Sequence, residues 1–590
     1  MPNKIALLGG TALALAIPAI AQQVQAPVTA LVTAPPAQTP AANAAAPVDQ
    51  PGAVRPIART GPSESTVEVV SNVTLAPPPS AVEYPSWARR DPASTGMLDP
   101  ADIGLGSAPW GAANGAFLST LMRRMDTPIA SRWAHIALRN ALLARAPAPR
   151  LVNPVDWTAE RAWLLLRMGE ADAARLLVAG VDTDRFSPKM VQVAVQSALA
   201  DGDPAALCPL EDAMRKYERG VRPLVTAMCS SLAGEPQIAS AQIGDARRYG
   251  RIGGIDLALA EKVVGAGSNT GRSTTIEWEP VENLNAWRFG LATATGLAVP
   301  DRLLTKASPQ LRAFQARAAL IEPEARLESA YIATGLGVFS SQSMIDLYSA
   351  IYDSTDPTDL PASDAWTLRQ AFVGKDRDSR LDSIRHFLAM NGDSLRTEGA
   401  RAVVARAASL IAPDAKLEKD APGLISAMLA AGYDRRAARW LKAVGSMSDD
   451  QADRCWAMLA LAAPEGADAG VSNGRINAFI GRDKSVGKQR SALLVAGLAG
   501  LGRISESQAN AINRRNGFGL GRTTSWTRMI DAAAMRRQQG TVLVLAGTGF
   551  QASGWAKSSA AHLYHVISGL KRGEQDFTAR MIAAEALSRT

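Results

Sequence analysis

Apolar positions between residues 157 and 250 follow a helical period, and each apolar stretch closes on the same short pattern of leucine, glycine and acid. The glycines of this pattern are Gly169, Gly202 and Gly234, which stand 33 and 32 positions apart. Glycine tolerates the positive φ that often follows a helix C-terminus. An acid is favoured at the N-terminus of the helix that comes next. The pattern therefore predicts three helical hairpins in tandem.

The motifs that carry the repeat are Leu166-Arg-Met-Gly169-Glu170-Ala171, Leu199-Ala-Asp-Gly202-Asp203-Pro204 and Leu232-Ala-Gly234-Glu235-Pro236. They resemble tetratricopeptide and Sel1-like helical repeats over residues 157–250. One hairpin cannot bury its own apolar face, so repeats of this kind stack on their neighbours, and the resemblance implies an α-solenoid. Pro204 and Pro236 suit first helical positions, whereas Pro209 is expected to interrupt the second hairpin.

The rest of the chain also favours an all-α fold. Aromatic residues make up 5% of the sequence, and few stretches alternate with the period of a strand. We expect an N-terminal helical-repeat segment over residues 86–264, an irregular connector over 265–300 and a C-terminal helical-repeat segment over 301–590. Ser505 with Gln508 is a predicted capping box, and residues 577–587 are predicted to form a final helix.

The first 21 residues have the parts of a secretory signal peptide. Lys4 supplies the positive charge, residues 5–17 form an apolar run too short to span a bilayer, and Ala19-Ile20-Ala21 is a small-residue cleavage site. We expect cleavage between Ala21 and Gln22, and because no cysteine follows, lipoprotein processing is not predicted. Residues 22–85 are rich in proline and alanine, which is typical of a disordered tether. The protein is therefore predicted to be periplasmic, without a transmembrane segment in its mature chain.

Two of the three cysteines are placed for a disulfide. Cys208 and Cys229 flank a predicted connection at residues 217–220 almost symmetrically, so two antiparallel helices joined there would hold both side chains at the same height. An exported protein can form such a bond, and the alternative is a pair of buried thiols. Cys455 is left over and is expected to be a small buried hydrophobe.

Positive charge is concentrated in one region. The chain carries a net charge of +8, and residues 471–540 hold twelve Lys and Arg against three Asp and Glu. A basic surface on stacked helices attracts anionic partners, here an acidic envelope protein, lipid headgroups or a cell-wall polymer, whereas export disfavours nucleic acid. The alternative is a solvated surface that aids solubility. The predicted binding residues are Arg482, Lys484, Lys488, Arg490, Arg514, Arg515, Arg522, Arg536 and Arg537.

Phosphate-loop and acyl-enzyme motifs are present only in fragments. The segment from Gly481 to Lys488 has five residues between its glycines and lacks the final Ser or Thr of a phosphate loop. Ser485 and Lys488 match the S-x-x-K of penicillin-binding enzymes, but the companion motifs are missing. Neither fragment predicts a nucleotide or any other cofactor.

Two further fragments concern glycan cleavage and metal binding. Glu328-Ser329 is similar to the Glu-Ser of lytic transglycosylases, a resemblance that implies Glu328 as general acid. His562 and His565 are spaced to share one helix face, yet no further ligand is spaced to complete a metal site. We therefore expect no metal centre and retain Glu328 only as a weak catalytic candidate.

The sequence as a whole predicts an exported helical-repeat scaffold or adaptor that binds a protein or an anionic envelope polymer without catalysis. One alternative is a cell-wall-acting enzyme with Glu328 as its acid. The other is a passive structural protein of the envelope.

Overall fold

The computed structural model describes residues 85–217, 220–250, 252–269, 275–390, 392–551 and 554–590. By its internal contacts the chain divides into Met1–Val82 and Glu83–Thr590, and all described helices belong to the second unit. The predicted signal peptide, its cleavage site between Ala21 and Gln22, and the tether up to residue 84 lie outside the described residues.

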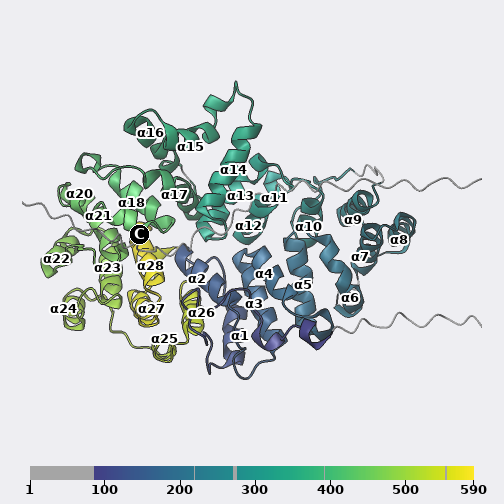
Figure 1. The fold of residues 1–590 in the computed structure, drawn as a ribbon, viewed down its shortest axis with the longest axis horizontal. Helices are drawn as coiled ribbons and strands as arrows, with labels where there is room; N and C mark the ends of the chain where they lie inside the picture. The colour runs from purple at the N-terminus through teal and green to yellow at the C-terminus, as the bar shows by residue number, and fades with distance from the viewer. Residues whose placement is uncertain (1–84, 218–219, 251, 270–274, 391, 552–553) are drawn as a thin grey trace, which may run out of the picture. The chain divides into compact units, whose positions relative to one another are not determined.

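The fold is all-α, which confirms the all-α part of the predicted fold class. The described residues contain 28 α-helices, which with short 3-10 turns give a helix content of 67%, and no strand (Figure 1). Two isolated bridges, Leu98 with Ala144 and Asn114 with Arg150, are the extended pairings found among those residues. Within the same part of the chain no helix combines the length and apolar character that a bilayer crossing requires.

The three glycines of the repeated motif end helical segments as predicted. Gly169, Gly202 and Gly234 have φ values of 90°, 65° and 82°. Pro209 lies inside the 3-10 turn η4, and a regular helix restarts directly after it, as expected. The elements of the three hairpins are α3 (Pro154–Met168) with α4 (Ala171–Ala179), α5 (Pro188–Ala200) with η4 (Pro204–Leu210) and α6 (Glu211–Tyr217), and α7 (Arg222–Leu232) with α8 (Pro236–Tyr249).

The acids that follow these glycines do not all act as helix caps. Asp203 does, because its side chain accepts a hydrogen bond from Ala206 N. Glu170 and Glu235 stand at N-cap positions without a side-chain bond to their helices. Glu170 is buried and instead accepts from Nε2 of His135 at 3.1 Å. The expectation of a capping role is therefore wrong for these two. The side chain of Glu170, one methylene longer than that of Asp, reaches past its own helix to His135, whereas Glu235 is exposed.

The remaining helices precede and follow the hairpins. Those in the N-terminal half are α1 (Gly115–Arg124), α2 (Arg132–Leu143), α9 (Gly254–Gly267), α10 (Ala286–Ala294), α11 (Asp301–Leu304), α12 (Pro309–Arg317) and α13 (Pro323–Leu336). Residues 265–300, expected to be irregular, thus include the last turn of α9 and all of α10. A buried Trp287 anchors α10 through its indole N–H, which donates to Asp256 O.

The C-terminal half continues as short helices joined by tight turns. They are α14 (Ser341–Ser354), α15 (Asp364–Val373), α16 (Arg377–Leu388), α17 (Ser394–Ala408), α18 (Ala421–Ala430), α19 (Asp434–Ala438), α20 (Leu441–Val444), α21 (Asp449–Ala462), α22 (Asn473–Arg482), α23 (Gln489–Gly500), α24 (Glu506–Asn516), α25 (Ser525–Met535), α26 (Gln539–Gly549), α27 (Ala560–Arg572) and α28 (Asp576–Ser588). The predicted capping box of Ser505 and Gln508 opens α24, and α28 is the expected last helix.

Close approach of α13 and α17 forms one of the tightest helix contacts. A Cβ on Gly399 would lie 2.2 Å from Tyr331 O, and one on Gly335 would lie 2.0 Å from Leu395 O. Each helix therefore presents a glycine to the other's backbone. Only glycine allows helix axes to come this near, so the crossing depends on both residues.

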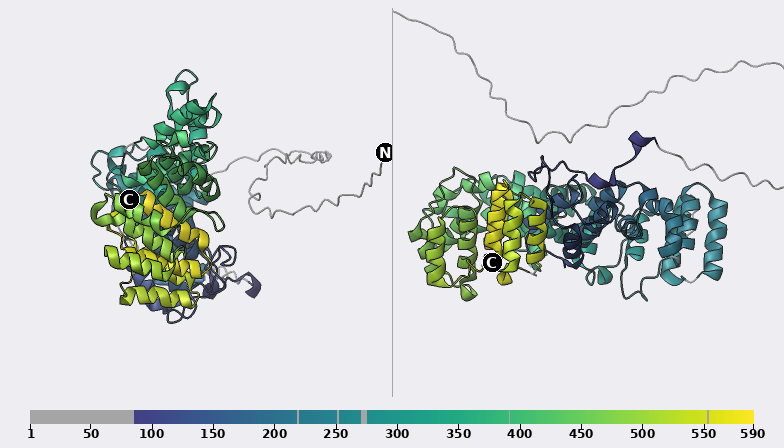
Figure 2. Two further views of the ribbon diagram at one scale, coloured as in Figure 1. Left: turned by 90° about the vertical axis from the view of Figure 1, so that its left-hand side faces the viewer. Right: turned by 90° about the horizontal axis from the view of Figure 1, so that it is seen from below.

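Helices from the two ends of the described chain pack together. α2 contacts α26 and α28 as well as its sequence neighbour α3. Figure 1 shows α26, in yellow, beside α2, and in Figure 2 the yellow C-terminal helices lie next to the blue helices of the N-terminal part. Glu585 of α28 fixes this contact, because its carboxylate accepts from Arg132 N at 2.8 Å and from Ser131 Oγ at 2.6 Å. The hairpins between α3 and α8 pack on their neighbours in sequence, whereas α2 joins elements more than 400 residues apart.

Candidate functional site

Two adjoining cavities lie where α18, α21, α23 and α28 meet. The first, here called the outer cavity, has a volume of about 720 Å³, and the second, the arginine cavity, about 420 Å³. Arg454, Arg490 and Thr590 line both, so the two cavities share part of their wall. Of the predicted binding residues, Arg482, Lys484 and Arg490 line the outer cavity.

Acidic side chains balance the charge of the outer cavity. Asp449, Asp450, Asp453 and Asp483 line it together with its cations. Arg482 forms two hydrogen bonds to Asp453, of 2.6 and 2.9 Å, and hydrogen bonding to Asp453 raises the pKa of Arg482 further above its usual value. Arg482 therefore belongs to an internal ion pair, and the prediction that it offers free charge to a partner is not supported by this geometry.

A short loop at residues 483–488 forms the rim of the outer cavity. Asp483 accepts from Ser485 N at 2.8 Å, from Ser491 N at 2.9 Å and from Ser491 Oγ at 2.6 Å. Burial alone would raise the pKa of Asp483, but these hydrogen bonds hold it below its ordinary value. Gly487 and Lys488 take left-handed φ values of 61° and 53°. The loop is thus fixed by a carboxylate while Val486, 95% exposed, stands at its tip.

The arginine cavity has a different chemistry. Its lining side chains include Arg401, Arg454 and Arg490 and no acid. Arg401 donates to Glu398 behind the wall at 3.1 Å, and Arg454 lies 3.4 Å from Asp450 on its own helix. The sequence window of 471–540 contains only Arg490 of these three, so the local charge count could not reveal the cavity.

Arg490 differs from its two neighbours because its guanidinium bonds to none of the described side chains or carbonyls. Its Nε is buried without a hydrogen-bond partner. The backbone N–H donates to Ser485 Oγ at 3.1 Å, which fixes the start of α23. A partly buried guanidinium with an unsatisfied donor, in the wall shared by both cavities, is placed to receive an anionic group.

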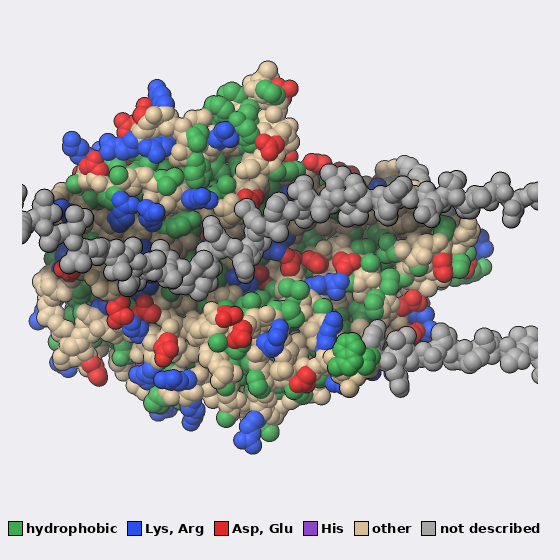
Figure 3. Space-filling model, viewed as in Figure 1, with side chains coloured by type: hydrophobic (Ala, Val, Ile, Leu, Met, Phe, Trp, Pro, Cys, Tyr) green, Lys and Arg blue, Asp and Glu red, His purple; other side chains and the backbone are tan. Residues whose placement is uncertain are grey.

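Five of the other predicted cations lie, together with Arg528, on α24, α25 and the turns beside them, and this group is here called the arginine patch. Lys488 lies in the loop at the rim of the outer cavity instead. The arginine patch comprises Arg514, Arg515, Arg522, Arg528, Arg536 and Arg537, all exposed. Among the described residues none of these side chains has a hydrogen bond or ion pair. Asp531, the acid within α25, is already bound to Nδ1 of His565 at 2.8 Å. Lys and Arg atoms are visible over α25 at the lower edge of the molecule (Figure 3).

Two arginines of the basic region serve the fold instead. Arg503 donates to the carbonyls of Ala460 and Ala463 at the end of α21, and burial lowers the pKa of Arg503 to about 10. Arg475 pairs with Asp453 at 2.9 Å and lies over the ring of Trp456. The excess charge counted from the sequence is therefore larger than the charge available at the surface.

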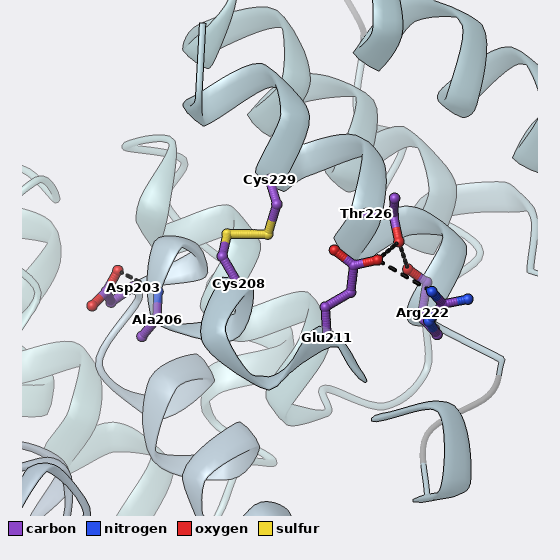
Figure 4. The surroundings of a disulfide bond; sticks show 7 residues. All are labelled: Asp203, Ala206, Cys208, Glu211, Arg222, Thr226 and Cys229. Atoms are coloured by element: carbon purple, nitrogen blue, oxygen red, sulfur yellow. Dashed lines mark hydrogen bonds and ion pairs between the residues drawn. A yellow bond between two sulfur atoms is a disulfide. The ribbon is translucent and has the colours of Figure 1, made fainter. Parts of the chain in front are cut away.

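Cys208 and Cys229 lie at bonding distance, as predicted. Their sulfurs are 2.03 Å apart and their Cα atoms 5.6 Å apart, and the bond joins η4 to α7 (Figure 4). Beside it Glu211 accepts from Thr226 Oγ1 at 2.6 Å, which ties α6 to α7. Cys455 is buried in α21, and burial raises the pKa of its thiol to about 12.

The catalytic candidates are not brought together. Glu328 is half exposed and accepts a hydrogen bond from Arg396 Nε at 3.0 Å, so its carboxylate is engaged in an ion pair at the surface. His562 bonds to Ala546 O and His565 to Asp531, so the two rings serve different partners. Within the described residues no group of three His, Cys, Asp or Glu is placed to hold a metal ion.

Comparison of the chain with protein-family models, with curated proteins and with solved structures finds no match in any of the three.

Proposed function

We propose that this protein is an exported, non-catalytic helical-repeat scaffold or adaptor of the periplasm that binds an acidic protein or an anionic polymer or lipid of the envelope. The observation that carries the proposal is the arginine patch. Six exposed guanidiniums share α24, α25 and the turns beside them without a partner among the described residues. Like charges held on one surface attract anions from solution and select against cationic partners.

The repeat architecture supports a binding role. Helical hairpins that pack on their sequence neighbours expose long continuous faces, and α3 to α8 pack in this way. We take these hairpins as a solenoid related to tetratricopeptide and Sel1-like repeats. A signal peptide over residues 1–21 would bring the chain to the periplasm, where mass spectrometry of the exported protein should find Gln22 as its first residue.

A cell-wall enzyme is the less favoured function. Glu328 is ion-paired with Arg396, half exposed, and lines none of the cavities described above. A general acid with a raised pKa usually sits in an apolar pocket. Glu328→Gln should therefore leave any glycan-cleaving activity of the purified protein unchanged.

The test of the proposed function compares two sets of five substitutions. In the patch variant Arg514, Arg515, Arg522, Arg536 and Arg537 are changed to Gln. In the control variant the same change is made at five exposed arginines elsewhere, none of which has a side-chain partner among the described residues: Arg124, Arg150, Arg185, Arg435 and Arg436.

Both variants and the wild type are used as bait in envelope extracts and in sedimentation with vesicles that contain phosphatidylglycerol. The wild type and the control should recover the same partner, and the patch variant should lose it. Binding should weaken steeply between about 50 and 500 mM salt, since exposed charges are screened over a few ångströms at high salt. Equal loss in both variants, or none in the patch variant, would refute the proposal.

A further inference from the structure

We propose that the arginine cavity binds a carboxylate of an acidic peptide segment, and that the outer cavity holds the residues next to it. This site shares no residue with the arginine patch, so the inference goes beyond the proposed function and does not rest on it. The peptide would be an extended stretch of a partner protein.

The first argument is the charge of the lining. Arg401 comes from α17, Arg454 from α21 and Arg490 from α23, and all three line a cavity of about 420 Å³ that no acidic side chain lines. Like charges that face one cavity repel each other unless an anion lies between them. Folding brings these three residues together from distant parts of the sequence. Arg401 is paired with Glu398 and Arg454 with Asp450, so a bound carboxylate would compensate the charge of Arg490, which has no acidic partner among the described residues.

The second argument is the unsatisfied donor of Arg490. Its Nε is buried without a partner, although buried donors in folded proteins are nearly always bonded. A guanidinium offers a planar fork that matches a carboxylate with two parallel hydrogen bonds. Because Arg490 lies in the wall common to both cavities, a ligand bonded to it would extend into each of them.

The remaining lining favours a peptide over a bare inorganic anion. Leu388, Met458 and Leu587 line the arginine cavity beside the guanidiniums, so a methylene chain that carries a carboxylate would find apolar contacts there. The volume lies within the range of roughly 300–1,000 Å³ that is usual for small-ligand sites. The buried Ser426 supplies a hydroxyl oxygen that can accept a backbone N–H.

The outer cavity suits the flanking part of an extended chain. It is larger than the arginine cavity and is lined by charges of both signs, among them Asp449, Asp450 and Lys484. Such a lining can form hydrogen bonds with both the N–H donors and the carbonyl acceptors of a peptide backbone. Asp483, Lys484 and Ser485 of the fixed loop line this cavity, and the exposed Val486 follows them in sequence.

The experiment uses the full chain and a fluorescein-labelled tetraglutamate with a free C-terminus, followed by fluorescence anisotropy. Arg490→Gln should weaken binding by at least about tenfold, since it removes the bidentate partner of the carboxylate. Arg490→Lys keeps the charge but not the planar guanidinium, so its affinity for the peptide should lie between those of the wild type and Arg490→Gln. Loss of the Arg490 guanidinium breaks no hydrogen bond among the described residues, so both variants should fold, which circular dichroism checks.

Arg528→Gln is the matched control, because it removes one exposed positive charge from the arginine patch. It should leave tetraglutamate binding within about twofold of wild type, and so should the five-residue patch variant. Tetraglutamine with an amidated C-terminus should not bind, and inorganic phosphate should displace the probe only weakly.

Three results would overturn the inference: no binding of tetraglutamate to the wild type, equal affinity in Arg490→Gln, or displacement by phosphate at lower concentration than by unlabelled peptide. The last would make the cavity a phosphate site. Loss of binding in the patch variant with full binding in Arg490→Gln would instead place the acidic ligand on the arginine patch. Failure of this inference can therefore be told apart from failure of the proposed function.

Discussion

Replacing Glu585 with Gln should loosen the contact between the two ends of the described chain. The Glu585 carboxylate is buried and accepts from Ser131 Oγ at 2.6 Å, Arg132 N at 2.8 Å, Trp133 N at 3.2 Å and Arg589 Nη1 at 2.6 Å. Two of these donors are the first N–H groups of α2, so a side chain of α28 caps a helix more than 400 residues earlier. Gln keeps the shape but turns one acceptor oxygen into a donor that faces other donors.

The expected cost follows from the partners that are lost. A hydrogen bond to a charged group contributes about 1.5–3 kcal/mol to stability, and removing one partner of a buried ion pair costs about 3–5 kcal/mol. Gln retains one acceptor oxygen, so about half of the bonds survive. We therefore expect Glu585→Gln to destabilise the contact of α2 with α28 by about 3 kcal/mol.

Hydrogen exchange measured by mass spectrometry can localise this effect. Amides of α2 and α28 should exchange faster by two orders of magnitude, as a change of about 3 kcal/mol in the free energy of local opening implies. Glu465→Gln is the control, because Glu465 is 88% exposed and a surface change of this kind costs little. Unchanged protection of α2 and α28 in Glu585→Gln would show that the carboxylate does not hold the ends together.

Three other changes test the packing and the chemistry of the fold. Gly399→Ala would place a Cβ against the backbone of α13 and should lower stability by about 3 kcal/mol or more. Gly244→Ala lies in open space within α8 and should raise stability by about 0.5–1 kcal/mol. Urea unfolding measures both changes. Burial lowers the pKa of His562 to about 4, so the unfolded chain binds the proton better and stability should fall as the pH drops from about 6.5 to 4, by about 3 kcal/mol. His562→Gln should flatten that part of a stability curve measured between pH 7 and 4.5. Changing Cys208 and Cys229 together to Ser opens a loop with a sequence separation of 21 and should lower stability by about 3 kcal/mol in the chain-entropy model. Backbone amides of α7 should then exchange hydrogen faster, while those of α28 exchange at an unchanged rate.

The features that the sequence predicts well are local ones. The left-handed turns at Gly169, Gly202 and Gly234 depend on the residue itself and on the end of the preceding helix. The pairing of Cys208 with Cys229 depends on one helix–turn–helix unit. In each case the deciding interactions lie within about one repeat of about 33 residues, so a pattern read along the chain contains them.

The surface charge was predictable only in part, because residues on other helices determine whether each charged side chain is paired or free. Arg482 and Arg475 are both bound by Asp453, which lies outside the basic window. Arg503 is taken up by carbonyls of α21. Arg401, by contrast, belongs to the arginine cavity although it lies 70 residues before that window. A count of charges along the sequence contains no information on these contacts between residues that are distant in sequence.

The arginine cavity and the closing contact of α2 with α28 are joined by a chain of ion pairs. Arg401 donates to Glu398 at 3.1 Å, Glu398 lies 4.0 Å from Arg589, and Arg589 donates to Glu585 at 2.6 Å. Burial alone would lower the pKa of Arg589, but the carboxylates of Glu585 and Glu398 hold this pKa above its ordinary value. An acidic ligand bonded to Arg401 would share that guanidinium with Glu398 and would act on the same network that caps α2. The wall of the cavity is therefore held in place by the residues that close the chain, which gives the proposed site a rigid frame built from both ends of the fold.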